Sequence, residues 1–146
     1  MSSPIGDLSI AAEGEYITNI VFGSEVRGAA TGISELLDTA VSQLNEYFAK
    51  KRQRFDLPLK FGGTDFQNRV WRELLTIPYG ETVSYKTLAE RIGNAKACRA
   101  VGMANNKNPI PIIIPCHRVI GANGNLTGYA GGLDVKKFLL DLEQNK

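Results

Sequence analysis

The sequence predicts an α+β protein in two modules, a small β-sheet with one helix followed by a mainly helical unit. Two strand-like apolar segments joined by a short turn occupy residues 8–12 and 16–22. A glycine pair, Gly62-Gly63, then separates this part from several segments with helical periodicity. We therefore expect domains of residues 1–62 and 63–146, since 146 residues suffice for two small domains that share a core.

The N-terminal module begins with a predicted hairpin, in which residues 13–15 form the turn. The segment 33–48 follows as an amphipathic helix, because its apolar residues recur at helical spacing. These apolar residues lie at positions 33, 36, 37, 40, 41, 44, 47 and 48. Alternating apolar residues over 55–59 predict a short strand, which the proline at 58 places at a sheet edge.

The C-terminal module begins with a helix, for which Thr64 and Gln67 form a predicted capping box. Its apolar stripe comprises Phe66, Val70, Trp71, Leu74 and Leu75, and Pro78 ends it. A second helix begins at a Ser84 cap and is closed by Gly93.

A third helix then carries small residues on one side, namely Ala97, Ala100, Val101 and Ala104. Two short helices joined by a Gly-Asn turn are typical of a helix-turn-helix, although such hairpins also occur in proteins that do not bind DNA. The segment 109–115 has prolines at both ends and predicts a buried extended run. Asp134 caps a last helix with the apolar stripe Val135, Phe138, Leu139 and Leu142.

Composition excludes several classes of protein. With 43% apolar and 22% charged residues, the chain has the usage of a globular protein rather than a disordered one. No apolar run approaches the roughly 20 residues that span a bilayer, and residues 1–8 lack the core of a secretory signal. Two cysteines and one histidine provide neither a disulfide framework nor a structural zinc site. We expect a cytoplasmic protein without metal, cofactor or membrane association.

Charge is distributed unevenly along the chain. Residues 1–48 carry one base and seven acids, whereas residues 84–118 carry six bases and one acid. A basic segment beside an acidic one indicates a module that faces a polyanion. From charge alone, a lysine-rich solvated surface explains the pattern equally well.

The sequence Cys116-His117-Arg118 is the strongest candidate for chemistry. A free thiol has a pKa of about 8.5, so a nucleophilic cysteine needs a neighbouring base or a cation. His117 supplies the first, directly or through a water, and Arg118 the second. The alternative is a buried structural cysteine. Cys98 has no base beside it and is interpreted as a packing residue.

His117 itself needs a group to orient it. Glu143 is the leading candidate because its neighbours on the last helix are predicted to face the core. Asp134 and Asp141 remain alternatives at this stage, since the sequence does not choose among the three carboxylates.

Several motifs together resemble one family. They are Val70-Trp71, Pro78-Tyr79-Gly80, Ser84-Tyr85, Leu88-Ala89, Ala97 to Val101, Asn108-Pro109, Ile114-Pro-Cys-His-Arg-Val119 and Gly128-Tyr-Ala-Gly-Gly132. In this order they are similar to the O6-alkylguanine-DNA alkyltransferases, also called methylated-DNA–protein-cysteine methyltransferases. The N-terminal segment Ser3-Pro-Ile-Gly6 resembles the family less closely. The resemblance implies a ribonuclease H-like N-terminal module and a winged helix-turn-helix in the C-terminal one.

The resemblance also implies catalytic roles. Cys116 would accept the alkyl group, His117 would deprotonate it through a water, and Glu143 would orient His117. Asn108 would be a hinge between the recognition helix and the active-site loop. Because a thioether is a poor leaving group, one protein molecule would act once.

Further residues would bind DNA and the damaged base. Arg99 would fill the gap left by the extruded base, Tyr85 would push the target phosphate, and Lys96, Ala97, Ala100 and Arg118 would contact DNA. Val119, Tyr129, Ala130 and Gly131 would line the base pocket, and Ala130 stands where relatives often carry serine.

The expected function is therefore irreversible repair of O6-alkylguanine, together with O4-alkylthymine, in double-stranded DNA. We expect a monomer in the free state, with cooperative binding along DNA left open. Three other functions stay open on the sequence: a recognition protein for alkylated bases, a cysteine hydrolase, and a transcription regulator in which the cysteine is structural.

Overall fold

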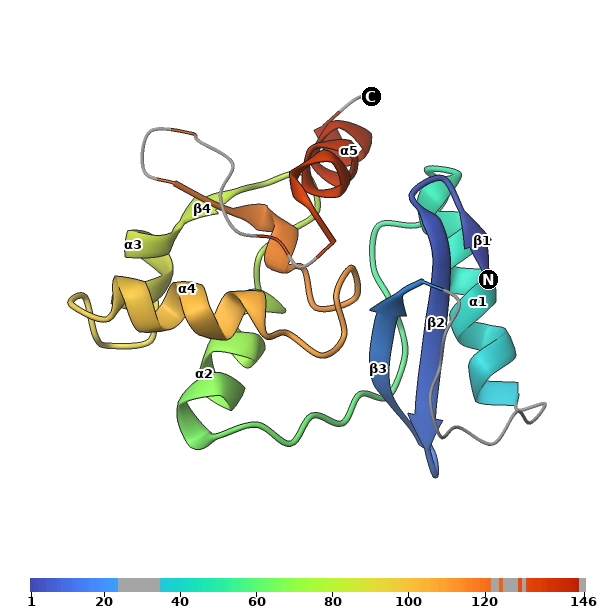
Figure 1. Cartoon of the computed structure of the whole chain (residues 1–146), viewed down its shortest axis with the longest axis horizontal. Coiled ribbons are helices and arrows are strands. Elements are labelled where there is room, and N and C mark those ends of the chain that lie inside the picture. The colour runs from blue at the N-terminus through green and yellow to red at the C-terminus, as the bar shows by residue number, and fades with distance from the viewer. Residues whose placement is uncertain (24–34, 122–123, 125–128, 130, 145–146) are drawn as a thin grey trace. The chain divides into compact units, whose positions relative to one another are not determined.

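The structure is a computed structural model that describes residues 1–23, 35–121, 124, 129 and 131–144. The chain divides into two compact units, Met1–Phe61 and Gly62–Lys146 (Figure 1). The first unit combines a sheet with a helix and the second is mainly helical, so the α+β fold class is confirmed.

The sheet of the first unit has three antiparallel strands in the order β1-β2-β3. They are β1 (Ser2–Ser3), β2 (Gly6–Glu13) and β3 (Tyr16–Phe22). The predicted hairpin is confirmed, and Gly14 in its turn adopts a φ of 61° that glycine tolerates without strain. The sequence did not predict β1, because two residues are too few to show an alternating pattern.

The helix α1 (Glu35–Phe48) packs against β2 and β3. It buries Ala40, Leu44 and Tyr47 from the predicted apolar stripe. Residues 33 and 34, where the prediction began, lie outside the described residues.

The predicted strand over 55–59 is wrong. The segment forms one bridge, between Leu59 and Ile17, and the Ile17 N–H donates to the Pro58 carbonyl at 2.8 Å. At Asp56 the backbone is bonded instead to the buried side chain of Gln43, which donates to the Asp56 carbonyl and accepts from its N–H. A side-chain amide has therefore replaced the ladder that alternation alone predicted.

In the second unit, the capping box of α2 (Asp65–Leu74) is confirmed. The Thr64 Oγ1 accepts from the Gln67 N–H at 3.1 Å, and the Gln67 side chain accepts from the Thr64 N–H at 3.0 Å. Trp71 packs inward and its Nε1 donates to the Ala104 carbonyl at 2.9 Å. Leu75 was predicted to be buried but is 43% exposed, because the helix ends before it.

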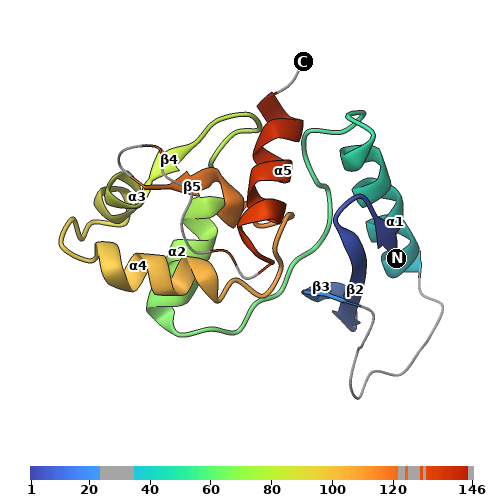
Figure 2. The same ribbon diagram turned by 45° about the horizontal axis from the view of Figure 1, so that its top comes forward.

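The expected helix pair consists of α3 (Tyr85–Arg91) and α4 (Cys98–Asn106). Ser84 caps α3, and Gly93 closes it with a φ of 84°. The two helices pack together, and the parallel pair of β4 (Val83–Ser84) and β5 (Val119–Ile120) lies beside α3 (Figure 2).

The predicted extended run over 109–115 is wrong. The Ile114 N–H donates to the Ile110 carbonyl at 2.9 Å, so the chain reverses direction in a buried turn. Ile112 has a φ of 76°, which a β-branched residue adopts only under strain. The isoleucines supply burial, as expected, but the local preference for extended backbone is overridden.

The last helix, α5 (Leu133–Gln144), begins two residues earlier than a cap at Asp134 predicts, so Asp134 lies in its first turn and is not its cap. Leu139 and Leu142 are buried as predicted. Phe138 is 37% exposed and Val135 half-buried, because the helix turns Lys136 and Glu143 toward the interior instead. Within the described ranges, every helix is too short or too polar to span a bilayer.

Candidate active site

The candidate nucleophile opens a short turn of 3-10 helix, η1 (Cys116–Arg118). Cys116 is buried, and its N–H donates to the Ile114 carbonyl at 2.8 Å. η1 lies against α2 and α5 in the second unit. The thiol is therefore held at the end of the strained turn described above.

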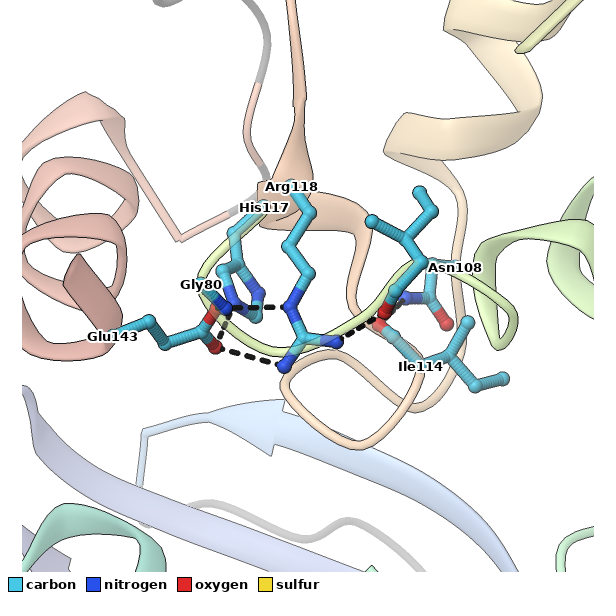
Figure 3. Close-up of polar contacts among 7 residues, drawn as sticks. Gly80, Asn108, Ile114, His117, Arg118 and Glu143 are labelled. Atoms are coloured by element: carbon cyan, nitrogen blue, oxygen red, sulfur yellow. Dashed lines mark hydrogen bonds and ion pairs between the residues drawn. The ribbon is translucent and has the colours of Figure 1, made fainter. Parts of the chain in front are cut away.

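Asn108 fixes this turn at both ends. Its Nδ2 donates to the Ile114 carbonyl at 2.7 Å (Figure 3). Its Oδ1 accepts from the Ile110 N–H at 2.9 Å. One side chain thus satisfies backbone groups that the reversal leaves unpaired. The geometry is that of a clamp at the junction between α4 and the loop that carries Cys116.

Asn105, on the inner face of α4, was not singled out from the sequence. It is buried, and its Nδ2 donates to the Cys116 carbonyl at 3.3 Å. An asparagine in the last turn of a helix gives no sequence signal for such a contact, because the same residue is ordinarily found on a solvated face.

His117 and Glu143 meet inside the second unit. His117 Nε2 lies 2.6 Å from Glu143 Oε2, and both side chains are almost completely buried (Figure 3). Of the three carboxylates considered, Glu143 alone is placed against His117. Asp134 is exposed, and Asp141 pairs with Lys137 on the surface.

Two further groups hold the Glu143 carboxylate. The Arg118 guanidinium donates from Nε to Oε1 at 2.8 Å and from Nη2 to Oε2 at 3.1 Å. The Gly80 N–H donates to Oε1 at 3.3 Å from a turn in which glycine has a φ of 80°. A Cβ at Gly80 would lie 3.3 Å from the Glu143 carbonyl oxygen, so this turn fits closely against α5.

Arg118 was predicted to contact DNA, but the structure turns its side chain into the second unit. Its side chain is buried, ion-paired with Glu143, and bonded through Nη1 to the Ile77 carbonyl at 2.6 Å. Its guanidinium also lies 5.8 Å from the centroid of the Tyr79 ring. Three of its five N–H donors are bonded inside the unit, so the guanidinium faces the interior and not the surface of α4 predicted to contact DNA.

Burial and neighbouring charges determine which of Glu143 and His117 carries a charge. Burial favours a raised pKa for Glu143, but hydrogen bonds and positive charge from His117 and Arg118 outweigh it and lower the pKa to about 2. Burial lowers the pKa of His117 below 6.5 despite the neighbouring carboxylate. At neutral pH Glu143 is therefore ionised and His117 is uncharged.

This assignment fixes the tautomer of His117. The ionised Glu143 can only accept, so the ring proton lies on Nε2 and Nδ1 carries the lone pair. Nδ1 is buried and has no hydrogen-bond partner among the described residues. It is a base without a proton, on the residue that follows Cys116.

The Cys116 thiol is itself protonated at neutral pH. Burial raises its pKa to about 11, although a hydrogen bond from Asn108 and the positive charge of Lys136 act in the other direction. The thiol in this structure therefore needs a base to become a nucleophile.

Lys136 is a buried cation that sequence reasoning missed. Its Nζ donates to the Val119 carbonyl at 2.6 Å and lies 5.8 Å from the centroid of the Tyr85 ring. A lysine on a helix ordinarily faces solvent, so its burial had no sequence signal. The cation secures β5, which continues directly from η1.

The residues predicted to form the base pocket and to push the phosphate differ in burial. Val119 and Tyr129 are buried and Gly131 is half-buried, while Ala130 lies outside the described residues. Tyr85 is half-buried at the first turn of α3.

The predicted DNA contacts other than Arg118 lie on or beside α4. Lys96, Arg99 and Ala100 are exposed and Ala97 is half-buried. The neighbouring Met103 is 59% exposed, so the outer face of α4 is open to a partner. Cys98 is half-buried at the start of the same helix. In the part of the chain that the structure describes, no group of acidic, histidine and cysteine side chains is arranged to hold a metal ion.

Comparison with known proteins extends over both units. Residues 65–145 match the family described as 6-O-methylguanine DNA methyltransferase, DNA binding domain, and residues 1–61 match its ribonuclease-like domain. The methylated-DNA–protein-cysteine methyltransferase of Mycobacterium bovis is 51% identical over 150 residues, which cover 100% of this chain and 91% of that protein. The protein of the same name from Methanosarcina acetivorans is 53% identical, covering 97% and 94%.

Comparison with solved structures gives the same family. The crystal structure of Mycobacterium tuberculosis OGT in complex with DNA superposes with a TM-score of 0.92 at 52% identity, covering 99% of this chain and 90% of that one. The chain therefore belongs to the 6-O-methylguanine DNA methyltransferase family.

Proposed function

We propose that this protein repairs DNA by transferring the methyl group of O6-methylguanine to Sγ of its own Cys116. The observation that carries the proposal is the buried Cys116 thiol followed by His117, whose Nε2 is held by Glu143 at 2.6 Å and whose Nδ1 bears the lone pair. The relatives named methylated-DNA–protein-cysteine methyltransferases support the same reaction for this chain.

The chemistry balances without a cofactor. The proton of the Cys116 thiol passes to Nδ1 of His117, through a bridging water, and Glu143 stabilises the imidazolium that forms. Sγ attacks the methyl carbon, so an S–C bond forms as the C–O6 bond breaks and its electron pair moves to the guanine. The leaving guanine takes up the proton, which returns His117 to its neutral form. The products are guanine and S-methylcysteine.

The reaction runs once for each protein molecule. Sγ in the product is a thioether, a poor leaving group with no proton to exchange, and nothing in the proposed cycle removes the methyl group. We extend the same chemistry to larger O6-alkyl groups and to O4-alkylthymine, in which the alkyl carbon is likewise bonded to an exocyclic oxygen of the base.

The substrate base must leave the duplex, because a buried thiol cannot reach an alkyl group inside the base stack. In this proposal the exposed Arg99 fills the gap in the stack and Lys96 binds a phosphate, while Ala97 and Ala100 permit close approach of α4. Tyr85 at the start of α3 pushes the target phosphate. Few of these side chains can read base edges, so binding depends on shape more than on sequence.

The base then enters a pocket formed by Val119, Tyr129, Ala130 and Gly131. Asn108 acts as the hinge between α4 and the loop that carries Cys116. Residues 63–146 thus supply both DNA binding and alkyl transfer. We propose that the protein is a cytoplasmic monomer when free.

The stoichiometry of guanine release tests this proposal. The protein is mixed with an excess of duplex carrying O6-methylguanine, and restored guanine is counted by digestion and chromatography. We expect a plateau at one guanine per protein, its loss in Cys116→Ala, and full retention in Cys98→Ala. Continued release beyond one equivalent would indicate a hydrolase, and tight binding without guanine release would indicate a recognition protein.

A further inference from the structure

The buried cluster at His117 contains more charge than acid–base chemistry requires. An ionised Glu143 next to His117 would by itself stabilise an imidazolium, because opposite charges attract strongly where water is excluded. Such a histidine would be drawn toward its protonated form, against the effect of burial, and a protonated ring cannot accept the Cys116 proton. A cation other than the imidazolium, bound to the same Glu143 carboxylate, makes protonation of His117 less favourable.

Arg118 is that cation, and all three nitrogens of its guanidinium are hydrogen-bonded inside the unit. It contacts both oxygens of Glu143, at 2.8 and 3.1 Å, and a third donor bonds the Ile77 carbonyl at 2.6 Å. The side chain is buried, and the Tyr79 ring lies beside the guanidinium. The bonds to Glu143 and to Ile77 come from three different nitrogens, so the guanidinium cannot rotate without breaking them.

Charge counting shows what the pair does to His117. Glu143 and Arg118 together carry no net charge, so a proton on His117 leaves the buried cluster with an uncompensated positive charge. Lys136, on the same helix as Glu143, adds further positive charge. The other titratable groups around the cluster are the protonated Cys116, Tyr79 and Tyr129, which are neutral at physiological pH.

We propose that Arg118 is a positioning residue for alkyl transfer, whose charge cancels that of Glu143 and so keeps His117 uncharged and ready to accept the Cys116 proton. This inference rests on the proposed function and adds a role for a residue that touches neither base nor thiol. Arg118 also makes the proton on His117 short-lived, because the imidazolium is favourable only while the thiolate is present. It thereby favours passage of the proton to the leaving guanine.

The single histidine of the chain allows a direct test, since its ring signals in an NMR titration need no assignment. The variants are Arg118→Met, which removes the charge, and Arg118→Lys, which keeps it. Arg52→Met is the matched control, because Arg52 pairs with Glu46 at 3.3 Å at the surface of the other unit.

We expect the pKa of His117 to rise by about one unit or more in Arg118→Met, and to stay near the wild-type value in Arg118→Lys and Arg52→Met. The acid limb of the methyl-transfer rate should move to higher pH by the same amount in Arg118→Met. An unchanged pKa in Arg118→Met, or an equal rise in both Arg118 variants, would overturn the proposal.

Nitrogen chemical shifts of His117 in the wild-type protein provide a second measurement that does not depend on the variants folding. They should show a neutral ring protonated on Nε2 at neutral pH, and a charged ring would refute the proposal. Neither NMR experiment requires methyl transfer. Failure of the repair reaction itself would appear separately, as an absence of guanine release by the wild-type protein.

Discussion

Cys116 and His117 are adjacent residues that are both uncharged in the resting protein. The thiol keeps its proton, and no imidazolium is present to stabilise a thiolate. Burial raises the pKa of Cys116 to about 11 and lowers that of His117 below 6.5. Ionisation must therefore accompany the arrival of substrate. This combination keeps the buried thiol in its unreactive form, with an uncharged imidazole on the next residue.

The pH dependence of methyl transfer follows from the raised pKa of Cys116 and the lowered pKa of His117. With duplex DNA at saturation, the single-turnover rate should be level from neutral pH upward, because His117 remains uncharged there. It should fall at acid pH, as His117 takes up a proton from solvent. A rate that instead rises by about tenfold per pH unit through neutrality would indicate spontaneous thiol ionisation and contradict the role of His117.

Glu143 links the site to stability. Its pKa of about 2 in the folded state lies below the ordinary value of 4.5, so the carboxylate stabilises the fold fully above that value. The contribution, about 3 kcal/mol, is lost as the pH falls from 4.5 toward 2. We expect Glu143→Gln to cost about 3–5 kcal/mol at neutral pH, because it leaves Arg118 as an uncompensated buried cation.

Urea denaturation at neutral and acid pH measures this effect. The gap between wild type and Glu143→Gln should narrow in acid. Asp141→Asn, on the exposed face of the same helix, should change stability by less than about 0.5 kcal/mol at neutral pH. A Glu143→Gln protein as stable as wild type at neutral pH would show that the carboxylate network contributes nothing.

At the residue scale, sequence reasoning identified groups with distinctive chemistry and misassigned those with ordinary chemistry. Cys116 and His117 stand out because the only histidine follows a cysteine. Arg118 was assigned to DNA binding, and Lys136 was not singled out. Their burial depends on contacts with Glu143 and Val119, which lie 25 and 17 residues away in sequence.

At the level of elements, α4 joins the surface to the site. Its outer face exposes Arg99, Ala100 and Met103, and on its inner face Asn105 bonds the Cys116 carbonyl while the Ala104 carbonyl accepts from Trp71. The helix therefore contacts solvent on one side and the backbone of the nucleophile on the other. The sequence predicted Ala97, Ala100, Val101 and Ala104 on one side of this helix, but Ala100 is exposed while Val101 and Ala104 are buried. The asparagine contact was not predicted.

Replacing Arg99 distinguishes extrusion of the base from duplex DNA from the alkyl-transfer step itself. Arg99→Ala should slow repair of O6-methylguanine in duplex DNA at least tenfold, because an unstacked duplex loses the side chain that fills its gap. Reaction with the free base O6-methylguanine, which needs no extrusion, should be nearly unchanged. Rates for both substrates are compared by chromatography of the products. Equal losses with the two substrates would contradict the proposed insertion.

Local signals predicted elements well where they were self-contained. The capping box at Thr64, the Ser84 cap and the Gly93 stop all involve residues within four positions of one another. The segment 109–115 failed because its turn is fixed by Asn108 and by burial, and Ile112 is forced to a φ of 76° against its own preference. Such strain cannot be inferred from a run of β-branched residues.

Over the whole molecule, charge follows the division into units. The unit 62–146 carries eleven bases and seven acids, whereas the unit 1–61 carries six bases and eight acids. Five of the six bases in residues 84–118 are exposed. The basic middle of the sequence is thus a surface of the second unit, with Arg118 as the exception.

The salt dependence of DNA binding tests this distribution. If four of the exposed cations contact phosphates, affinity should fall on the order of a hundredfold for a fourfold rise in salt. Fluorescence anisotropy with a labelled duplex measures the slope, and an undamaged duplex of the same sequence should give nearly the same one. An affinity independent of salt would refute phosphate anchoring by this surface.

The fold class and the order of the elements could be predicted because amphipathic periodicity and turn residues act over short distances. The arrangement around Glu143 could not, because it joins a turn at residue 80, the 3-10 helix at 116–118 and the last helix. The family resemblance connected these segments before the structure did, since their order along the chain carries information that local physics lacks.

The location of the transferred carbon tests the account most directly. After reaction with a duplex carrying O6-methylguanine, the protein is digested and each cysteine peptide is weighed by mass spectrometry. One methyl group should replace one hydrogen on the peptide containing Cys116, with the Cys98 peptide unmodified. A methyl group on Cys98, or an unmodified Cys116 in protein that has restored guanine, would contradict it.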